Sequence, residues 1–394
     1  MAPRSRWRFW LWLGLTSFGG PGAQIASLRA EVVDRRGWLT AEQFDRALGL
    51  CFFLPGPEAQ QMVVWTAWKL DGWRSGLLAA WAFVLPGLLA CGALGFVYVL
   101  YGQLPSVEAA LIGVRAVVAG ILFVSAWRIG SSACRSWWHG LTSVAAFFGL
   151  ILGLPFGVFA LIAGALGWRL AKDDEAASAS VPPEGILTRL GRGLLPFAIL
   201  LGAVIAWAGG MVGYGRLAAV SVFAVLTSFG GAYAALSLWR TQADAAGWLS
   251  AGRFGDALAV GEATPGPLML AGSFVGFVAG YQGALGDGGG WGPAALGLVI
   301  PAVFTFGIST ALILATAPWG EVGVASARFR GAMDLIVAAA AGALAWMGAM
   351  MVIGAGGRPL PVVLTILAAV VSQYRLLGVL PLLALGALAG WWLG

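Results

Sequence analysis

Runs of about 20 or more apolar residues, separated by short charged loops, are the main pattern along this chain. Such runs predict membrane-spanning helices, because a helix satisfies its own backbone hydrogen bonds in lipid. The alternating strands of roughly ten residues that build a transmembrane barrel do not occur in the sequence. The expected fold class is therefore an all-α, polytopic protein of the cell inner membrane.

The apolar runs divide into long and short ones. The first half offers four spans, at about 9–28, 47–69, 75–101 and 107–128. Residues 141–170 and 360–393 each hold two apolar stretches that are short for a span. The sequence leaves open whether these stretches cross the membrane or form re-entrant hairpins.

The two halves of the chain resemble each other at an offset of about 210 residues. The ordered matches are TSFGG at 16–20 and 227–231, Trp38 and Trp248, Phe44 and Phe254, and PGP at 55–57 and 265–267. One shared tripeptide is easily found by chance in a glycine-rich chain, but several in the same order indicate an internal repeat.

A charged segment with two adjacent prolines, residues 172–192, has the composition of a linker and separates the halves. We expect a first transmembrane repeat at 1–171, this cytoplasmic linker, one connecting span at 193–211, and a second repeat at 212–394. The single connecting span would reverse the second half, so the prediction is two inverted-topology repeats, as in many secondary transporters.

Basic residues set the expected orientation. Arg4, Arg6 and Arg8 precede the first apolar run, and no small-residue cleavage site closes that run, so we expect a retained first helix with a cytoplasmic N-terminus. On this scheme the linker is cytoplasmic. The loop at 29–46 would face outward although it carries four arginines, which fits the positive-inside rule badly.

Glycine and proline interrupt four apolar segments at matching places in the halves. We call these interruptions the first break (residues 18–21), the second break (55–57), the third break (229–231) and the fourth break (265–267). Proline removes a helical hydrogen-bond donor, and glycine permits positive φ and close approach of a ligand. The exposed N–H groups at the start of the next half-helix suit an anion, and inverted pairing would gather the breaks near the midplane. The alternative is that they are packing kinks.

These breaks and the hydroxyls beside them supply the candidate binding residues. They are Thr16, Ser17, Phe18, Gly19, Gly20 and Pro21; Pro55, Gly56 and Pro57; Thr227, Ser228, Phe229, Gly230 and Gly231; and Thr264, Pro265, Gly266 and Pro267. The hydroxyls either donate to an oxyanion or bond back to the preceding helical turn.

Two acids, Glu58 and Glu262, flank the PGP breaks. Acids in apolar spans are costly and usually functional, and burial favours their protonated form, so both are candidates for proton coupling. Glu262, within about a turn of the fourth break, is the first choice, and Glu58 is the symmetric candidate. The structural alternative is a salt bridge, for example between Glu58 and Lys69. Glu58 has Leu268 at the equivalent position of the second half, so the halves need not do equal work.

Other residues offer little chemistry. Cys51, Cys91 and Cys134 lie apart in or near apolar stretches, and His139 is the only histidine, so we expect no disulfide, no metal site and no cofactor. The formal charge of +6 is spread over separate loops, which argues against nucleic-acid binding. The acidic pair Asp173 and Asp174 lies in the linker, which argues against an enzyme that binds metal and diphosphate in the membrane.

The sequence around the breaks resembles the chromate ion transporter family in its long two-domain form. The motifs are TSFGGP, RRGWLT and LPGPE in the first half, and GEATPGPLML with a following FVGF in the second. The resemblance implies a transporter that exports chromate and so gives chromate resistance. Family members often carry histidine where Gln24 stands, so Gln24 joins the candidate binding residues, but no titrating role can be assumed there. Ala232 replaces the motif proline of the second half.

Three alternatives stay open from the sequence. The substrate is chromate, sulfate or another tetrahedral oxyanion, because no residue separates these ions. The protein is a carrier or a passive anion channel of the same fold. Its partners are the oxyanion and membrane lipid, and the oligomeric state stays open between a monomer and a homodimer.

Overall fold

The computed structural model describes residues 6–133, 136–154, 156–171, 212–228, 232–318, 327–354 and 358–393, with a few residues between 195 and 206. All regular structure in these residues is helical. The predicted linker at 172–192 and most of the predicted connecting span lie outside the described residues. So do Phe229, Gly230 and Gly231 of the third break.

The first half contains eight α-helices and one π-helical turn in the described residues. They are α1 (Arg6–Thr16), α2 (Gly20–Arg29), η2 (Ala30–Arg35), α3 (Ala41–Phe53), α4 (Glu58–Asp71), α5 (Trp73–Tyr101), α6 (Pro105–Ala133), α7 (Trp137–Ile151) and α8 (Phe156–Leu170).

The described second half runs through a similar series. Its helices are α10 (Val212–Leu226), α11 (Ala232–Ala245), α12 (Phe254–Ala263), α13 (Leu270–Tyr281), α14 (Trp291–Thr316), α16 (Ala327–Gly354), α17 (Pro359–Gln373) and α18 (Val379–Leu393).

In the part of the chain that the structure describes, four helices are long and apolar enough to cross a membrane: α5, α6, α14 and α16. Each has at least 26 residues, which at about 1.5 Å per residue exceeds the hydrocarbon core of about 30 Å. The prediction of an all-helical polytopic membrane protein is confirmed.

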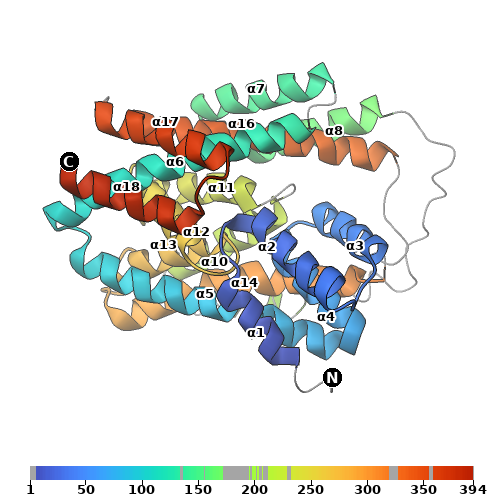
Figure 1. Cartoon of the computed structure of the whole chain (residues 1–394). Coiled ribbons are helices and arrows are strands. Elements are labelled where there is room, and N and C mark those ends of the chain that lie inside the picture. Colours follow the sequence, from blue (N-terminus) through green and yellow to red (C-terminus); the bar gives the residue numbers. More distant parts are fainter. Residues whose placement is uncertain are drawn as a thin grey trace.

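The helices form two layers (Figure 1). One layer holds α6 and α16, packed on each other and flanked by the short helices α7, α8, α17 and α18. The other holds α5 and α14 with α1, α4, α10 and α13. Contacts of α12 with α6 and of α11 with α16 join the layers.

The short terminal hairpins are exchanged between the halves. The helices α7 and α8 pack on α16, whereas α17 and α18 pack on α6. The Ser143 hydroxyl donates to the Ala338 carbonyl at 2.6 Å, and the Thr365 hydroxyl donates to the Ala116 carbonyl at 3.0 Å. Each of the four short helices has 15 residues, about 22 Å, so none crosses the hydrocarbon core upright.

Glycine brings these helices into backbone contact. A Cβ on Gly113 of α6 would lie 1.9 Å from the Gly386 carbonyl oxygen of α18, and one on Gly167 of α8 would lie 2.1 Å from the Gly331 carbonyl oxygen of α16. Small residues at such crossings are how helices pack tightly within lipid, where the hydrophobic effect does not drive association.

The expected span at 9–28 is wrong, because the chain turns back at the first break. Trp38, beyond η2, packs on Phe9 with ring centroids 5.0 Å apart, and the Arg36 guanidinium lies 4.5 Å from the centroid of the Phe9 ring. Two short helices separated by left-handed glycines therefore replace one span. The loop at 29–46, predicted to face outward, thus reaches the N-terminal end of α1 at Arg36 and Trp38.

The expected span at 47–69 is also divided, into α3 and α4 on either side of the second break. Helix α4 ends beside the start of α1, where the Arg6 guanidinium and the Asp71 carboxylate are 2.7 Å apart. Because α3 begins close after Trp38, the pair α3 and α4 also enters and leaves at the N-terminal end of α1.

An arginine–tryptophan contact at the start of α1 recurs in the second half. The Arg6 guanidinium lies 5.4 Å from the Trp38 ring centroid, and that of Arg216 lies 5.7 Å from the Trp248 ring centroid. Helix α10 begins against the loop between α13 and α14, where the Tyr214 hydroxyl donates to Asp287. The start of α10 and the end of α11 thus lie together, as the ends of α1 and η2 do.

Candidate functional site

The first and fourth breaks meet inside the protein. The Gly266 N–H donates to the Ser17 carbonyl at 2.9 Å. The Gln24 amide then donates to the Gly266 carbonyl at 2.5 Å. Residues more than 240 positions apart in the chain are thus joined by one backbone–backbone and one side chain–backbone hydrogen bond at two interrupted helices.

The break glycines adopt the conformation that their sequence context predicts. Gly19, Gly20 and Gly266 have φ of 89°, 77° and 96°, and Gly56 has φ of 129°. Residues with a Cβ rarely occupy this region, so these positions favour glycine. The prolines that follow or precede them prevent continuation of the incoming helix.

Helix α5 supports the fourth break from one side. A Cβ on Gly87, directly after the helix-interior Pro86, would lie 1.9 Å from the Pro265 carbonyl oxygen. The fourth break is therefore seated against bare backbone of a membrane-spanning helix.

The second break lies against α14. A Cβ on Gly56 would lie 2.5 Å from the Ser309 hydroxyl and 2.7 Å from the Gln61 amide nitrogen. The Gln61 amide donates to the Pro55 carbonyl at 2.9 Å, and the Gln60 amide donates to the Thr310 hydroxyl at 2.7 Å. These polar side chains line the N-terminal end of α4, whose first N–H groups are free of helical partners.

Several buried polar atoms around the breaks lack a hydrogen-bond partner among the described residues. They are the hydroxyl oxygens of Ser17 and Ser309, the amide oxygens of Gln24, Gln60 and Gln61, and one carboxylate oxygen of Glu58. A buried polar atom without a partner costs about 1–3 kcal/mol, so such a cluster indicates a place where water or a ligand completes the bonding.

The other candidate hydroxyls bond to their own helices. Those of Thr16 and Thr227 donate to Trp12 and Phe223 at 2.9 and 2.6 Å, and that of Ser228 donates to Val225 at 2.7 Å. The Thr264 hydroxyl has a long contact of 3.4 Å with the Gly261 carbonyl. Among these five, Ser17 alone is buried with its hydroxyl unpartnered.

Both candidate acids are buried, Glu58 with 3% and Glu262 with 4% of its surface exposed. Glu58 begins α4, and Lys69 lies in its last turn, 11 residues later. At about 1.5 Å per residue the two are about 16 Å apart along the axis, so the salt bridge between them is excluded. Glu262 lies in the last turn of α12, directly before the fourth break.

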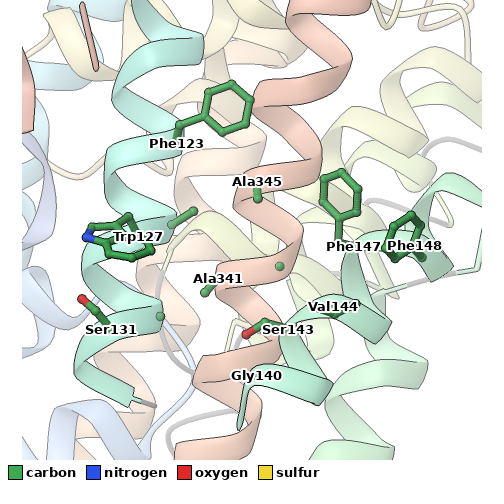
Figure 2. Close-up of a pocket in the computed structure, with 13 residues that line it drawn as sticks. Phe123, Trp127, Ser131, Gly140, Ser143, Val144, Phe147, Phe148, Ala341 and Ala345 are labelled. Atoms are coloured by element: carbon green, nitrogen blue, oxygen red, sulfur yellow. The ribbon is translucent and has the colours of Figure 1, made fainter. Parts of the chain in front are cut away.

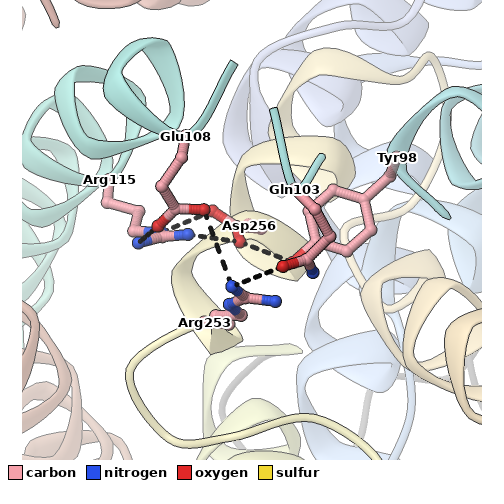
Figure 3. Close-up of polar contacts among 6 residues, drawn as sticks. All are labelled: Tyr98, Gln103, Glu108, Arg115, Arg253 and Asp256. Atoms are coloured by element: carbon pink, nitrogen blue, oxygen red, sulfur yellow. Dashed lines mark hydrogen bonds and ion pairs between the residues drawn. The ribbon is translucent and has the colours of Figure 1, made fainter. Parts of the chain in front are cut away.

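A charged network within the helices was missed by the sequence reasoning. The Arg115 guanidinium of α6 forms a bidentate ion pair with the Asp256 carboxylate of α12, with N–O distances of 2.6 and 2.8 Å. Figure 3 shows this pair. The Tyr98 hydroxyl donates to the same carboxylate at 2.9 Å, and Glu108 and Arg253 complete the cluster. This network joins the two layers at the first turn of α12, the helix that leads to the fourth break. A single arginine inside the apolar run of α6 was the available signal.

An apolar hollow of about 740 Å³ between α6, α7 and α16 is a poor place for an anion. Figure 2 shows aromatic rings such as Trp127 and Phe147 along its walls. Its polar groups include Ser143, whose hydroxyl already donates to the Ala338 carbonyl. The lining therefore fits hydrocarbon and excludes an oxyanion.

The histidine and the cysteines, for which the sequence predicted no chemistry, have these surroundings in the structure. The His139 ring nitrogen lies 2.9 Å from the Ser136 hydroxyl, at the start of α7. Cys51 and Cys91 are buried thiols, and Cys134 lies outside the described residues.

Four span-length helices and internal helix breaks that meet across the chain define a multi-pass membrane protein of the transporter class. The sequence matches the chromate transporter family over residues 5–168 and 215–391, and the chain belongs to this family. The resemblance seen in the break motifs is thus confirmed. Because the chain belongs to a family of transporters, the alternative of a membrane enzyme is excluded.

Three relatives carry related names. A chromate transport protein of Pseudomonas aeruginosa is 33% identical over 274 residues, 68% of this chain and 64% of that protein. A probable chromate transport protein of Synechococcus elongatus is 29% identical over 394 residues, 97% of this chain and 93% of that protein. A chromate transport protein of Cupriavidus metallidurans is 29% identical over 291 residues, 70% of this chain and 68% of that protein. No solved structure matches the chain.

Proposed function

We propose that this protein carries an oxyanion, chromate in the first place, out of the cell through a site formed by its helix breaks. The observation that carries the proposal is the bond between Ser17 and Gly266 beside a buried Ser17 hydroxyl with no partner among the described residues. A tetrahedral dianion needs several converging donors and few acids, and hydroxyl, amide and helix-end N–H groups meet that need. The names of the relatives favour chromate over sulfate.

Other residues around the breaks contribute to the proposed binding site to different degrees. Gln24 positions the fourth break through Gly266, and its amide can turn toward a ligand. Ser309, Gln60 and Gln61, which the sequence reasoning omitted, join the site beside the second break. The back-bonded hydroxyls of Thr16 and Thr227 are weaker candidates than Ser17, because binding would break a bond that they already make.

The proposed architecture is two inverted repeats, at 1–171 and 212–394, joined by the linker at 172–192 and the span at 193–211. The shared helix order, the recurring arginine–tryptophan contact and the mutual exchange of hairpins support it. The first repeat would open its broken helices toward the N-terminal side, and the second toward the opposite side.

With the chain turned back at the first break, the distribution of arginines between the two membrane faces fits the positive-inside rule better. With the loop at 29–46 on the same side as the N-terminus, its arginines Arg29, Arg35, Arg36 and Arg46 join the cytoplasmic set. The misfit that remained in the sequence-based topology disappears, because the first break turns the chain back.

Cysteine labelling checks the topology. We expect a cysteine at the exposed Glu42 to react with a membrane-impermeant thiol reagent from the cytoplasmic side, and one at the exposed Ser250 only from the other side. Native Cys51, Cys91 and Cys134 would first be replaced. Labelling of both positions from one side would contradict the inverted repeat.

Proton coupling is proposed through Glu58 and Glu262. A carboxyl group can stay buried at low cost while it is protonated, and an adjacent dianion repels the ionised form. The bound anion would therefore favour the protonated acid, so anion and proton would be coupled in the same state of the carrier. Glu58 is favoured, because one of its oxygens is buried without a partner among the described residues.

Transport in proteoliposomes tests the whole proposal. Purified protein should take up labelled chromate, with unlabelled sulfate as competitor, and should respond to an imposed pH gradient. Flux that follows only the anion gradient, at channel-like rates and without saturation, would favour the passive channel. Equal flux in protein-free liposomes would refute oxyanion transport. In cells, export predicts greater chromate resistance on expression.

A further inference from the structure

A second cavity, outside the site described above, lies between the tip of the α7–α8 hairpin and helices α10 and α11, and its mostly apolar wall carries several charged side chains. Its volume is about 720 Å³. Thr227, next to the third break, lies at its wall together with Arg216 and Arg240. The cavity therefore extends along α10 as far as Thr227, just after the end of that helix.

Arg240 has unusual surroundings for a cation in a membrane protein. Its guanidinium lies 4.6 Å from the centroid of the Trp346 ring on α16. Within the helices that the structure describes, no carboxylate lies within salt-bridge distance of Arg240, although the Asp244 carboxylate is near enough to interact with it electrostatically. Asp244, one turn further along α11, also lines the cavity, but it is exposed and accepts the Ala251 N–H at 2.8 Å.

The corresponding arginine of the first half is neutralised. Arg29 follows Gly20 by nine residues, as Arg240 follows Gly231. The Arg29 guanidinium lies 2.6 Å from the Asp45 carboxylate. The position that matches Asp45 in the second half is Gly255, which carries no acid, and the next residue, Asp256, is held by Arg115. The second half thus keeps its acid occupied elsewhere and leaves this arginine for another partner.

We infer that this cavity is an anion vestibule, in which the Arg240 guanidinium binds the oxyanion on its way to or from the interior of the second half. The inference rests on the proposed function and adds a second, one-sided subsite to it. A guanidinium stacked on an aromatic ring keeps a fixed plane and offers paired N–H donors that match two oxygens of a tetrahedral anion. Arg216, exposed at the same wall, adds positive potential and attracts anions into the cavity.

Thiol labelling tests the vestibule without relying on transport. A cysteine at Thr241, an exposed residue of the cavity wall, would be placed in a background without the three native cysteines. Its reaction rates with an anionic and a cationic methanethiosulfonate reagent would be compared. We expect Arg240→Gln to lower the anionic-to-cationic rate ratio several-fold, and Arg240→Lys to change it little. Sulfate should slow labelling of the parent and not of Arg240→Gln.

The matched control is Arg35→Gln, which removes one positive charge from an arginine whose side chain is 72% exposed beside Glu31. It should leave the ratio unchanged. An unchanged ratio in Arg240→Gln, or sulfate protection that persists in it, would overturn the vestibule.

Transport kinetics separate this inference from the proposed function. Loss of one charge-assisted hydrogen-bonding group should raise KM for chromate by about tenfold with a smaller effect on kcat. Parent protein that transports chromate while Arg240→Gln keeps its KM would overturn the vestibule alone. Parent protein without oxyanion flux would refute the carrier, and the labelling ratio would still decide whether the cavity attracts anions.

Discussion

Gly87→Ala is expected to reduce chromate uptake into proteoliposomes by roughly 10- to 100-fold. The added Cβ would lie 1.9 Å from the Pro265 carbonyl oxygen, which is backbone and cannot rotate away. Helix α5 or the fourth break must then shift, and the bond between Gly266 and Ser17 shifts with it. Overpacking of this kind typically costs about 1–3 kcal/mol.

The matched control is Gly49→Ala in the middle of α3, where an added Cβ would meet no atom within 4 Å. It should keep full transport, because alanine is the better helix former. Initial rates would be normalised to inserted protein measured by size-exclusion chromatography. Gly19→Val, which forces a β-branched residue to a φ of 89°, should also abolish uptake. Full activity in both Gly87→Ala and Gly19→Val would mean that the breaks are only packing kinks.

Glu58→Gln is expected to abolish the response of flux to an imposed pH gradient while chromate still binds. Glutamine has the shape of the protonated acid and cannot release a proton, so the carrier would be locked in one charge state at this position. We expect the same of Glu262→Gln if the two acids share the coupling, and a normal response if Glu58 acts alone. The measurement is pH-jump-driven uptake, with binding of labelled chromate as the second readout.

Glu42→Gln supplies the control, because Glu42 lies on the exposed face of α3 beside Arg46. It should respond to the gradient as the parent does. A parent-like response in both buried-acid variants and their double mutant would place coupling elsewhere. A parent without any response would leave the membrane potential or another ion as the driving force.

The sequence predicted the breaks well, because their cause is local. Proline and glycine act on the residues next to them, so Gly19, Gly56 and Gly266 adopt the positive φ that their contexts indicate. The turning back of the chain at the first break was not predicted. Hydropathy counts apolar residues along a segment and gives the same value whether α1 and α2 continue or fold back on each other.

Contacts between distant residues were the other part that the sequence could not supply. Arg115 and Asp256 are 141 positions apart, and no repeat or motif connects them. The glutamines Gln60 and Gln61 looked like ordinary polar residues of a helix. Only the packing of α4 against α14 places them beside Ser309 and leaves their amide oxygens buried.

The exchanged hairpins set an order of events during synthesis. When α6 leaves the ribosome, the two helices that will cover it, α17 and α18, have not yet been made. The glycine face of α6, including Gly113, therefore stays in the bilayer without its packing partner α18 until nearly the whole chain has been translated. The first half can thus be inserted early but cannot reach its final packing alone. A chaperone or insertase that shields this face would protect the nascent protein for most of its synthesis.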